Sequence, residues 1–367
     1  MSIAVTHLRS STGLYGAEQV VLELCRQHGA LHGQAQLIVF APTGQAPPVL
    51  INEALRRGLD AEGLDCRSAL DLYCIADLRR RLRTSCRAGP VVLHCHDYKS
   101  VVYGGLASVG LPLVRIATLH GWLDGGGRLR LYHWLEARML KQFKRVCAVS
   151  PLIVKQLLQQ GLDSGRVRRV DNGIDTSRYR PKTGLRNANR ARYLQLGTAA
   201  RLSPEKNLGL LIRAVGKCWE RGLEIRLEIV GDGPQRSELE ALAEDLGLSG
   251  QIGFRGCVDS LEDWYPGLDA FVLSSLREGM PISILEALAC GCPVIASDVG
   301  AVRELLDGIA GCQVVPADDL RALTNAMMAL RFTSGPLPEA SERISNRYSS
   351  AHMARCYAGI YQEAISS

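Results

Sequence analysis

Short apolar runs alternate along the whole chain with longer segments in which apolar residues recur at helical spacing. In the first half, the runs predict strands at 2–8, 36–40, 90–95, 113–119 and 145–149. The helical segments between them are 17–28, 75–86, 129–143 and 151–160. Strands that alternate with helices predict parallel sheets covered on both faces, which is an α/β fold.

The same alternation returns in the second half. Strands are predicted at 193–198, 225–230, 251–254, 270–274, 293–297 and 312–315, and helices at 207–221, 234–247, 281–290, 301–307 and 318–330. The polar, basic stretch 178–190 contains Pro181 and Gly184 and is predicted to be a linker. A second break at 333–338 precedes a last helix from about Ser349 to Ala364.

The 367 residues are too many for one ordinary core. We therefore predict two Rossmann-like doubly wound domains, 1–180 and 190–335, with a C-terminal segment 345–367. Doubly wound sheets bind ligands at the carboxyl ends of their strands, so the loops that follow the strands should hold the functional residues.

The loop after the strand at 270–274 carries two glutamates around a predicted helix start. Pro281 suits the first turn of this helix, because its missing N–H would be unpaired there. The free N–H groups at 279–283 then form an anion site. Glu278 and Glu286 would repel a phosphate but accept hydrogen bonds from hydroxyls, which fits a diphosphate between two polyols. On spacing alone, a helix-dipole carboxylate beside a solvated glutamate fits equally well.

Two cations follow the strand at 193–198. Arg201 and Lys206 are five residues apart across Pro204 and could converge on one diphosphate. Arg201 would donate two hydrogen bonds to paired oxygens, and Lys206 would act as a point charge. The alternative is a surface loop with two solvated cations. The sequence has no Asp-x-Asp motif, so no metal is expected to assist them.

Other polar residues stand at strand ends. His94 and His96 close one predicted strand and His120 another, where a structural and a functional role are both open. We expect no metal site, because His94-Cys95-His96 and Cys290-Gly-Cys292 are compact and lack partners. The turn at 11–18 lacks the third glycine of the dinucleotide fingerprint, so no nicotinamide cofactor is expected.

Charge is distributed unevenly. The net charge is +6, but residues 1–180 carry a balance of +10 and the remainder one of −4. A basic first half suggests an anionic partner: nucleic acid, a membrane surface, or an acceptor with phosphate. The twelve cysteines are scattered and include no C-x-x-C pair, which fits a reducing cytosol. No apolar run reaches the roughly 20 residues of a membrane span, and no cleaved signal peptide is expected.

Taken together, these segments resemble the retaining family 4 glycosyltransferases of the GT-B fold (glycosyl transferases group 1). The resemblance rests on the order of its motifs: Gly-x-x-Gly-Ala-Glu at 13–18, Thr-x-His at 118–120, Val-Ser at 149–150, Asn-Gly-Ile-Asp at 172–175, Arg201 with Lys206-Asn207, Gly-Asp-Gly-Pro at 231–234, Phe-Arg-Gly at 254–256, Glu-x7-Glu at 278–286 and Arg-Tyr-Ser at 347–349. Tyr15 stands where the family often has a glycine.

The resemblance implies that the two domains face each other across a cleft, that the first binds the acceptor and the second the nucleotide sugar, and that the last helix crosses back to the first domain. Donor contacts would come from Gly16, Arg201, Lys206, Arg255, Gly256, Cys257, Glu278, Gly279, Met280, Pro281, Ile282 and Glu286. The catalytic groups would be His120, Glu278, Arg201 and Lys206, with His120 positioning the sugar rather than acting as general base. Glu286 would bind the ribose and Glu278 the transferred sugar.

The predicted reaction is metal-independent transfer of a hexose-type sugar from a nucleoside diphosphate to an acceptor hydroxyl, with retention. The expected partners are the nucleotide-sugar donor, a glycan or lipid-linked acceptor of cell-surface polysaccharide or glycolipid synthesis, and a cytoplasmic membrane surface, but not nucleic acid. Three alternatives stay open: a sugar-nucleotide epimerase or hydrolase on the same fold, a catalytically silent interaction protein, and a nucleic-acid binder. The expected location is cytoplasmic or peripheral at the inner membrane face.

Overall fold

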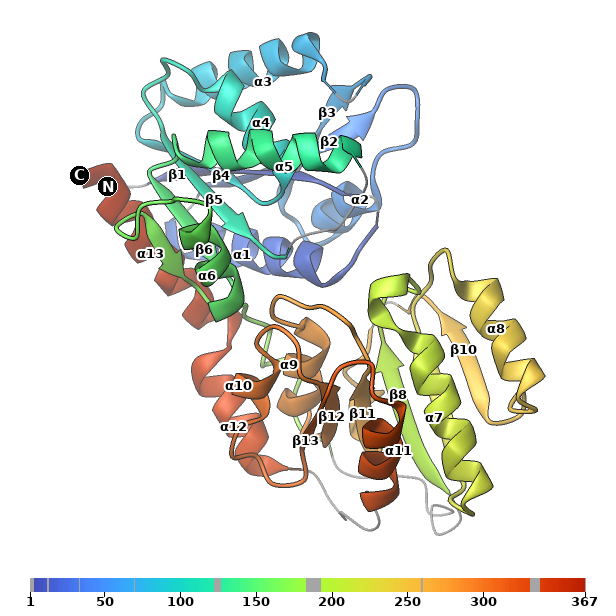
Figure 1. Ribbon diagram of the computed structural model, residues 1–367. Coiled ribbons are helices and arrows are strands. Elements are labelled where there is room, and N and C mark those ends of the chain that lie inside the picture. The colour runs from blue at the N-terminus through green and yellow to red at the C-terminus, as the bar shows by residue number, and fades with distance from the viewer. Residues whose placement is uncertain are drawn as a thin grey trace. The chain divides into compact units, whose positions relative to one another are not determined.

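The computed structural model describes residues 3–11, 13–32, 34–68, 70–121, 127–182, 193–258, 260–330 and 337–366. The chain divides into two compact units, the first being Met1–Gly173 with Ser350–Ser367 and the second Ile174–Ser349 (Figure 1). Residues 183–190 of the predicted linker and 333–336 of the predicted break lie outside the described residues. None of the described helices is long and apolar enough to cross a membrane.

The first unit is built on a seven-stranded sheet in the order β3-β2-β1-β4-β5-β6-β7, with every neighbouring pair parallel. Its strands are β1 (Ala4–Ser10), β2 (Ala35–Pro42), β3 (Asp60–Cys66), β4 (Val91–Cys95), β5 (Val114–Leu119), β6 (Arg145–Ala148) and β7 (Val167–Arg169). Its helices are α1 (Gly16–His32), α2 (Val49–Arg56), α3 (Leu72–Ser85), α4 (Tyr98–Ala107), α5 (Gly127–Leu140), α6 (Pro151–Gln159) and α13 (Ser350–Ser366).

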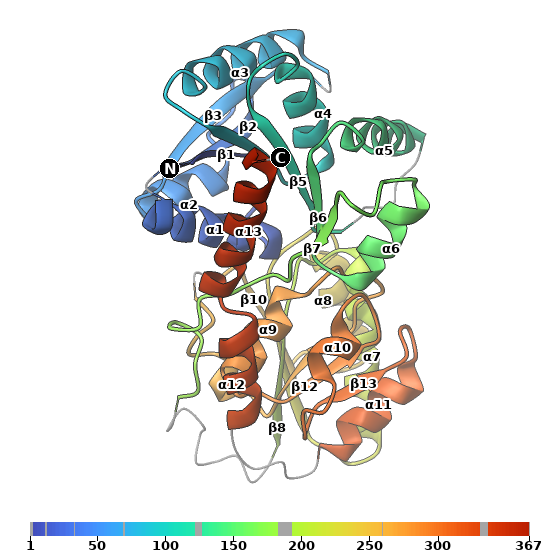
Figure 2. The same ribbon diagram turned by 90° about the vertical axis from the view of Figure 1, so that its left-hand side faces the viewer.

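Helices cover both faces of this sheet. Helices α1 and α13 lie together on one face, and α3, α4 and α5 on the other (Figures 1 and 2). Helix α13 is held there by a hydrogen bond of 3.0 Å from Gln27 to Ser350 and an ion pair of 2.6 Å between Arg145 and Glu363. The prediction that the last helix returns to the first domain is therefore confirmed.

The second unit contains a six-stranded parallel sheet in the order β10-β9-β8-β11-β12-β13. Its strands are β8 (Leu194–Ala199), β9 (Ile225–Val230), β10 (Ile252–Gly256), β11 (Ala270–Leu273), β12 (Val294–Ser297) and β13 (Gln313–Val315). Its helices are α7 (Leu208–Glu220), α8 (Arg236–Asp245), α9 (Ile282–Ala289), α10 (Val302–Leu306), α11 (Leu320–Ala329) and α12 (Pro338–Arg347), with short 3-10 turns at Pro204–Lys206 and Tyr265–Gly267. The apolar faces of α7, α8 and α11 form one core with this sheet.

The predicted α/β class with two doubly wound parallel sheets is confirmed, but five elements were missed. Strand β3 is polar and buries only Leu64 and Cys66, because it is an edge strand, and β7 has three residues. Helix α4 was hidden by its adjacent Gly104 and Gly105, which are unfavourable inside a helix. Both are needed for packing, since a Cβ on Gly105 would lie 2.3 Å from Met139 Cε. Helices α2 and α12 were also not predicted.

Candidate functional site

The two candidate loops of the second unit meet at one point of its sheet. Strands β8 and β11 are neighbours, but the chain leaves β8 toward β9 and β11 toward β12, on opposite sides. This reversal opens a crevice between the loops that follow the two strands. The backbone N–H of Leu276 donates to the Glu205 carbonyl at 2.8 Å, and Ser274 Oγ donates to the Lys206 carbonyl at 2.9 Å. Ser274 and Lys206, which are 68 positions apart in the chain, are thereby joined into one site.

Lys206 and Glu278 form an ion pair at the centre of this site. Lys206 Nζ lies 2.7 Å from Glu278 Oε1, and Ser275 Oγ donates to the same oxygen at 2.7 Å. The Lys206 side chain is 22% exposed and that of Glu278 is 11% exposed, so both are partly accessible. The sequence predicted two separate contacts, one to phosphate and one to sugar. The structure places a cation and a hydroxyl acceptor side by side, which suits a molecule with phosphate next to a polyol.

The loop that carries Arg201 is clamped by the turn after β9. Leu202 N donates to the Asp232 carbonyl and Gln235 N to the Leu202 carbonyl, both at 3.0 Å. Gly231 has φ of +125°, and a Cβ there would lie 1.9 Å from the Ala200 carbonyl oxygen. Only glycine permits this approach. The Arg201 side chain is exposed, at the start of the loop that ends in Lys206.

The segment after Glu278 runs into α9, which begins at Ile282 rather than at the predicted 281, with Pro281 immediately before it. Met280 and Ile282 are buried, and the N-cap residue of α9, Pro281, makes no side-chain hydrogen bond to its first turn. The first-turn N–H groups are therefore not capped by that residue, which suits an anion-binding helix start. Ala301 N donates to the Gly279 carbonyl at 2.9 Å, which fixes the loop from the other side.

Glu286 lies inside α9 and is almost completely buried, being 9% exposed. Tyr265 OH donates to its Oε2 at 2.8 Å, and Tyr179 also hydrogen-bonds to it. Burial raises the pKa of Glu286 to about 7, although both phenols oppose that rise. The sequence predicted Glu286 as a ribose acceptor but not its two tyrosine partners, which lie far from it in the chain.

Residues 255–257 were predicted to line the nucleotide base, but the side chain of Arg255 already has another partner. Arg255 pairs with Glu228 at 2.5 Å, and Trp264 Nε1 donates to the other oxygen of Glu228 at 2.6 Å. Gly256 is left-handed with φ of +67°, and its carbonyl accepts from Gly231 N at 2.8 Å. Cys257 is exposed. What this segment offers a ligand is therefore mainly backbone.

In the first unit, Gly16 opens α1 in the loop after β1. The structure adds two residues that the sequence did not single out: Arg9 and Glu18 are buried and form an ion pair at 2.7 Å. Glu18 also accepts from Tyr15 N at 3.1 Å, and Arg9 donates to the His96 carbonyl at 2.9 Å. The Glu of the Gly-Ala-Glu motif thus ties the first loop to β1 and β4. The sequence signals were a charged residue inside an apolar strand for Arg9 and the Gly-x-x-Gly-Ala-Glu motif for Glu18.

His120 follows β5 and lies beside His96. His120 Nε2 is 3.4 Å from His96 Nδ1, and the two rings stack with centroids 5.6 Å apart. Burial lowers the pKa of His120 to about 3, and the Arg9 charge adds to the effect. The imidazole is therefore neutral at physiological pH and offers hydrogen bonds rather than charge.

Solved structures with this fold define the class. The crystal structure of Anabaena HepE in complex with UDP aligns with a TM-score of 0.83 over 98% of this chain and 100% of that one, at 19% identity. Sucrose-phosphate synthase from Thermosynechococcus elongatus aligns with a TM-score of 0.77 over 99% of each chain, at 17% identity. At these identities the likeness shows the fold, which is GT-B.

Sequence comparison shows the family. The model of "Glycosyltransferase Family 4" matches residues 15–178, and that of "Glycosyl transferases group 1" matches 194–331. The D-inositol 3-phosphate glycosyltransferase 2 of Catenulispora acidiphila is 30% identical over 341 residues, 83% of this chain and 79% of its own. A mannosyltransferase of Mycolicibacterium smegmatis, GDP-mannose-dependent and named for phosphatidylinositol monomannoside, is 29% identical over 335 residues, 84% of this chain and 83% of its own. The chain belongs to glycosyltransferase family 4 and is a glycosyltransferase.

Proposed function

We propose that this enzyme transfers a hexose-type sugar from a nucleoside-diphosphate sugar to an acceptor hydroxyl, with retention of configuration. The observation that carries the proposal is the ion pair of Lys206 and Glu278 at the sheet reversal of the second unit. A cation next to a carboxylate, followed by an uncapped helix start, matches the phosphate–sugar junction of such a donor. The names of two similar proteins support this donor class: HepE was solved with UDP-glucose, and the M. smegmatis enzyme is named GDP-mannose-dependent.

The proposed chemistry is electrostatic. As the sugar departs, negative charge builds on the diphosphate and positive charge on the sugar. Arg201, Lys206 and the first-turn amides of α9 would stabilise the diphosphate, and the Lys206 side chain is already held in place by Glu278. Two protein cations can supply this charge without a metal. Glu278 would accept from the sugar hydroxyls and stabilise the oxocarbenium-like carbon.

The sequence singles out no nucleophile at this site, and we assign Glu278 to the sugar hydroxyls rather than to attack on the sugar carbon. We therefore assign proton acceptance to an oxygen of the departing phosphate, on the same face of the sugar as the incoming hydroxyl. His120, which is neutral, would position the sugar by hydrogen bonding. Glu286 would accept from the ribose hydroxyls in place of one of its tyrosines.

For the acceptor we propose a lipid-linked or phosphorylated glycan at a cytoplasmic membrane face. The basic balance of residues 1–180 favours an anionic partner, and the relative from M. smegmatis is named for a phosphatidylinositol glycolipid. A nucleic acid would be attracted by the same charge, but it would not need the Lys206–Glu278 pair.

The donor class is tested first and the reaction second. A thermal-shift screen against UDP-, GDP- and ADP-sugars should give one stabilising family, and Arg201→Ala and Lys206→Ala should abolish the shift while remaining folded. Wild-type donor affinity in both variants, measured by calorimetry, would show that the site is misassigned. Turnover of the donor without any acceptor would instead indicate the epimerase or hydrolase alternative, and binding without any turnover the silent protein.

A further inference from the structure

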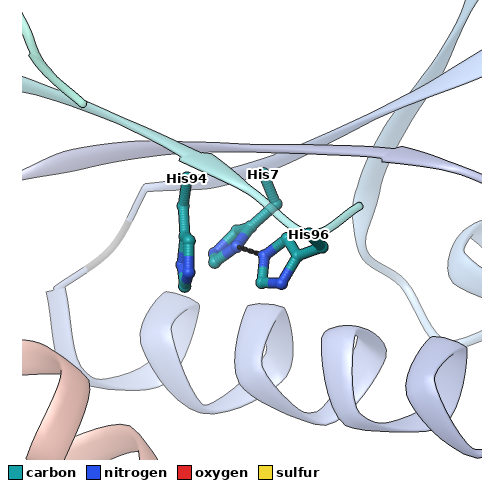
Figure 3. A group of neighbouring side chains, drawn as sticks. All are labelled: His7, His94 and His96. Carbon is teal, nitrogen blue, oxygen red and sulfur yellow. Dashed lines mark hydrogen bonds between the residues drawn. The ribbon is translucent and has the colours of Figure 1, made fainter. Parts of the chain in front are cut away.

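Three histidines of the first unit converge on the sheet face that α1 and α13 cover (Figure 3). His7 on β1 and His94 on β4 are partners in the strand register. His96 lies two residues beyond His94, so the alternation of side chains in a strand brings it to the same face. All three are at most 2% exposed. His94 and His96 alone do not predict a metal site; strand pairing adds His7.

We propose that His7, His94 and His96 form a binding site for one divalent transition-metal ion of the zinc class. One ligand nitrogen from each residue lies within 4.8 Å of the others. Zinc–nitrogen bonds of about 2.0–2.1 Å put neighbouring ligands of a tetrahedral ion roughly 3.4 Å apart. His7 Nδ1 and His96 Nε2 are already 3.0 Å apart, so mainly His94 has to turn toward them.

The charge state of the three rings suits metal binding. Burial lowers the pKa of each well below the ordinary value, so they are neutral, which is the form that binds metals. The hydrogen now shared between His7 and His96 would move to the far nitrogen of its own ring. No net proton has to leave. Three neutral imidazoles leave a fourth position open on a tetrahedral ion, and zinc, cobalt, nickel and copper all accept such ligands.

Outer hydrogen bonds that would orient the ligands are already present. The two ring nitrogens of His94 each lie 2.7 Å from a hydroxyl, Tyr361 OH and Thr118 Oγ1. If His94 gives up Thr118, that hydroxyl keeps Tyr357 OH at 2.9 Å. A metal-bound histidine normally holds such a partner through its other nitrogen, which fixes its tautomer.

His7 bears the main cost of the site. Its Nε2 is buried with no hydrogen-bond partner among the described residues, and this nitrogen would carry the ring hydrogen once Nδ1 binds the metal. The nearby Arg9 charge would oppose a dication, but Glu18 neutralises it at 2.7 Å.

The proposal is tested by metal content, which does not depend on sugar transfer. Full-length protein with its affinity tag removed is produced in zinc- or cobalt-supplemented medium, passed through a chelator column and analysed by mass spectrometry for metal. We expect about one equivalent per chain, a rise in melting temperature of about 5 °C or more over the chelator-stripped form, and the visible absorption of tetrahedral Co²⁺ with nitrogen ligands. His7→Gln and His96→Gln should each reduce the metal at least tenfold.

A histidine–cysteine pair elsewhere in the first unit could also attract metal in this experiment. His352 Nε2 and Cys356 Sγ lie 3.6 Å apart on α13 and are partly exposed. All measurements are therefore repeated in a His352→Gln/Cys356→Ser background, which should retain the metal and lack any thiolate-to-cobalt absorption. Metal that disappears in this background, or wild-type protein that takes up no metal and shows no shift, overturns the proposal. Both results are independent of whether the donor site is correctly assigned.

Discussion

Lys206 and Glu278, 72 residues apart in the sequence, form an ion pair 2.7 Å long between the loops that follow β8 and β11. A partly buried pair such as this contributes little net stability by itself, because the loss of hydration offsets much of the attraction between the charges. Its arrangement matters more than its energy. Each group holds the other in position, and each has an obvious second partner in the proposed donor, phosphate for the lysine and sugar hydroxyls for the glutamate.

Glu278→Gln should therefore have opposite effects on the binding of the diphosphate and on the binding of the intact sugar nucleotide. The amide keeps the shape but releases Lys206, so affinity for the free nucleoside diphosphate should stay the same or rise a few-fold. Sugar-nucleotide affinity should fall about tenfold, and kcat should fall further because the carboxylate no longer faces the developing positive charge. Isothermal titration with diphosphate and with the intact donor, followed by steady-state kinetics, measures both.

Glu205→Gln is the matched control, since it removes a carboxylate on the same loop whose partner is Ser203. It should change the affinities for diphosphate and sugar nucleotide by the same factor. An equal loss of both ligands in Glu278→Gln would mean that Glu278 positions Lys206 rather than the sugar.

Glu286 should give donor binding a pH dependence near neutrality. Its pKa of about 7 means that half of the protein carries a neutral carboxyl at that pH, whereas hydroxyl donors favour the ionised form. Affinity should therefore increase as pH rises through 7, and binding below pH 7 should release a proton. Calorimetry in two buffers of different ionisation enthalpy detects that proton. Glu286→Gln should bind more weakly with a flat profile, and Tyr265→Phe should move the midpoint to higher pH.

Glu286 should also make the stability of the fold fall as pH rises toward neutrality. The folded-state pKa lies above the ordinary value of about 4.3, so the unfolded chain ionises first as pH rises. Wild-type protein should thus lose on the order of 2–3 kcal/mol between about pH 4 and pH 7 relative to Glu286→Gln. Urea unfolding of both proteins at several pH values measures this difference. A constant difference would show that Glu286 is not buried as a neutral acid.

Gly300 should be essential to the loop that holds Glu278. Its φ is +57°, and a Cβ there would lie 2.3 Å from the Glu278 carbonyl oxygen and 2.4 Å from that of Gly279. Gly300→Ala therefore combines an unfavourable backbone with a collision, and we expect about 2–4 kcal/mol of destabilisation together with loss of donor binding.

Gly308→Ala separates the two causes. Gly308 has a similar φ of +68° but nothing within 4 Å of an added Cβ. Gly308→Ala should lower the stability of the fold by only about 1 kcal/mol, the cost of a left-handed backbone in a residue other than glycine. It should leave donor affinity unchanged. Equal effects of the two substitutions, by urea unfolding and titration, would contradict a steric role for Gly300.

The sequence predicted the regular elements of the second unit except α12, because these strands and helices have clear apolar periods. It missed β3, whose exposed edge needs few apolar residues, and α4, whose glycines serve packing against Met139. It also located Arg201, Lys206 and Glu278 in loops that meet, since strand ends share one edge of a sheet, and Glu286 in the helix that follows one of these loops. It could not predict that Glu286 hydrogen-bonds to Tyr265 or that His7 faces His94, because those pairings depend on strand order and register.

The basic first half should bind anionic membranes if the acceptor is lipid-linked. The exposed face of α3 and the turn after it carry Arg83 and Arg87. Vesicles of phosphatidylcholine with one third phosphatidylglycerol should sediment the protein at low salt. Release is expected as ionic strength rises toward physiological values, where the screening length is about 8 Å.

Arg83→Glu/Arg87→Glu should weaken this binding at least fivefold, since each reversal removes an attraction of about 1 kcal/mol and adds a repulsion. The matched control is Arg213→Glu/Arg321→Glu, which reverses two exposed cations of the second unit, where the sequence is already acidic overall. If both pairs weaken binding equally, net charge alone controls it and α3 has no special role. If wild-type protein does not sediment even at low salt, the membrane part of the proposal is wrong, while the sugar-nucleotide site is unaffected, because Lys206 and Glu278 do not depend on where the acceptor resides.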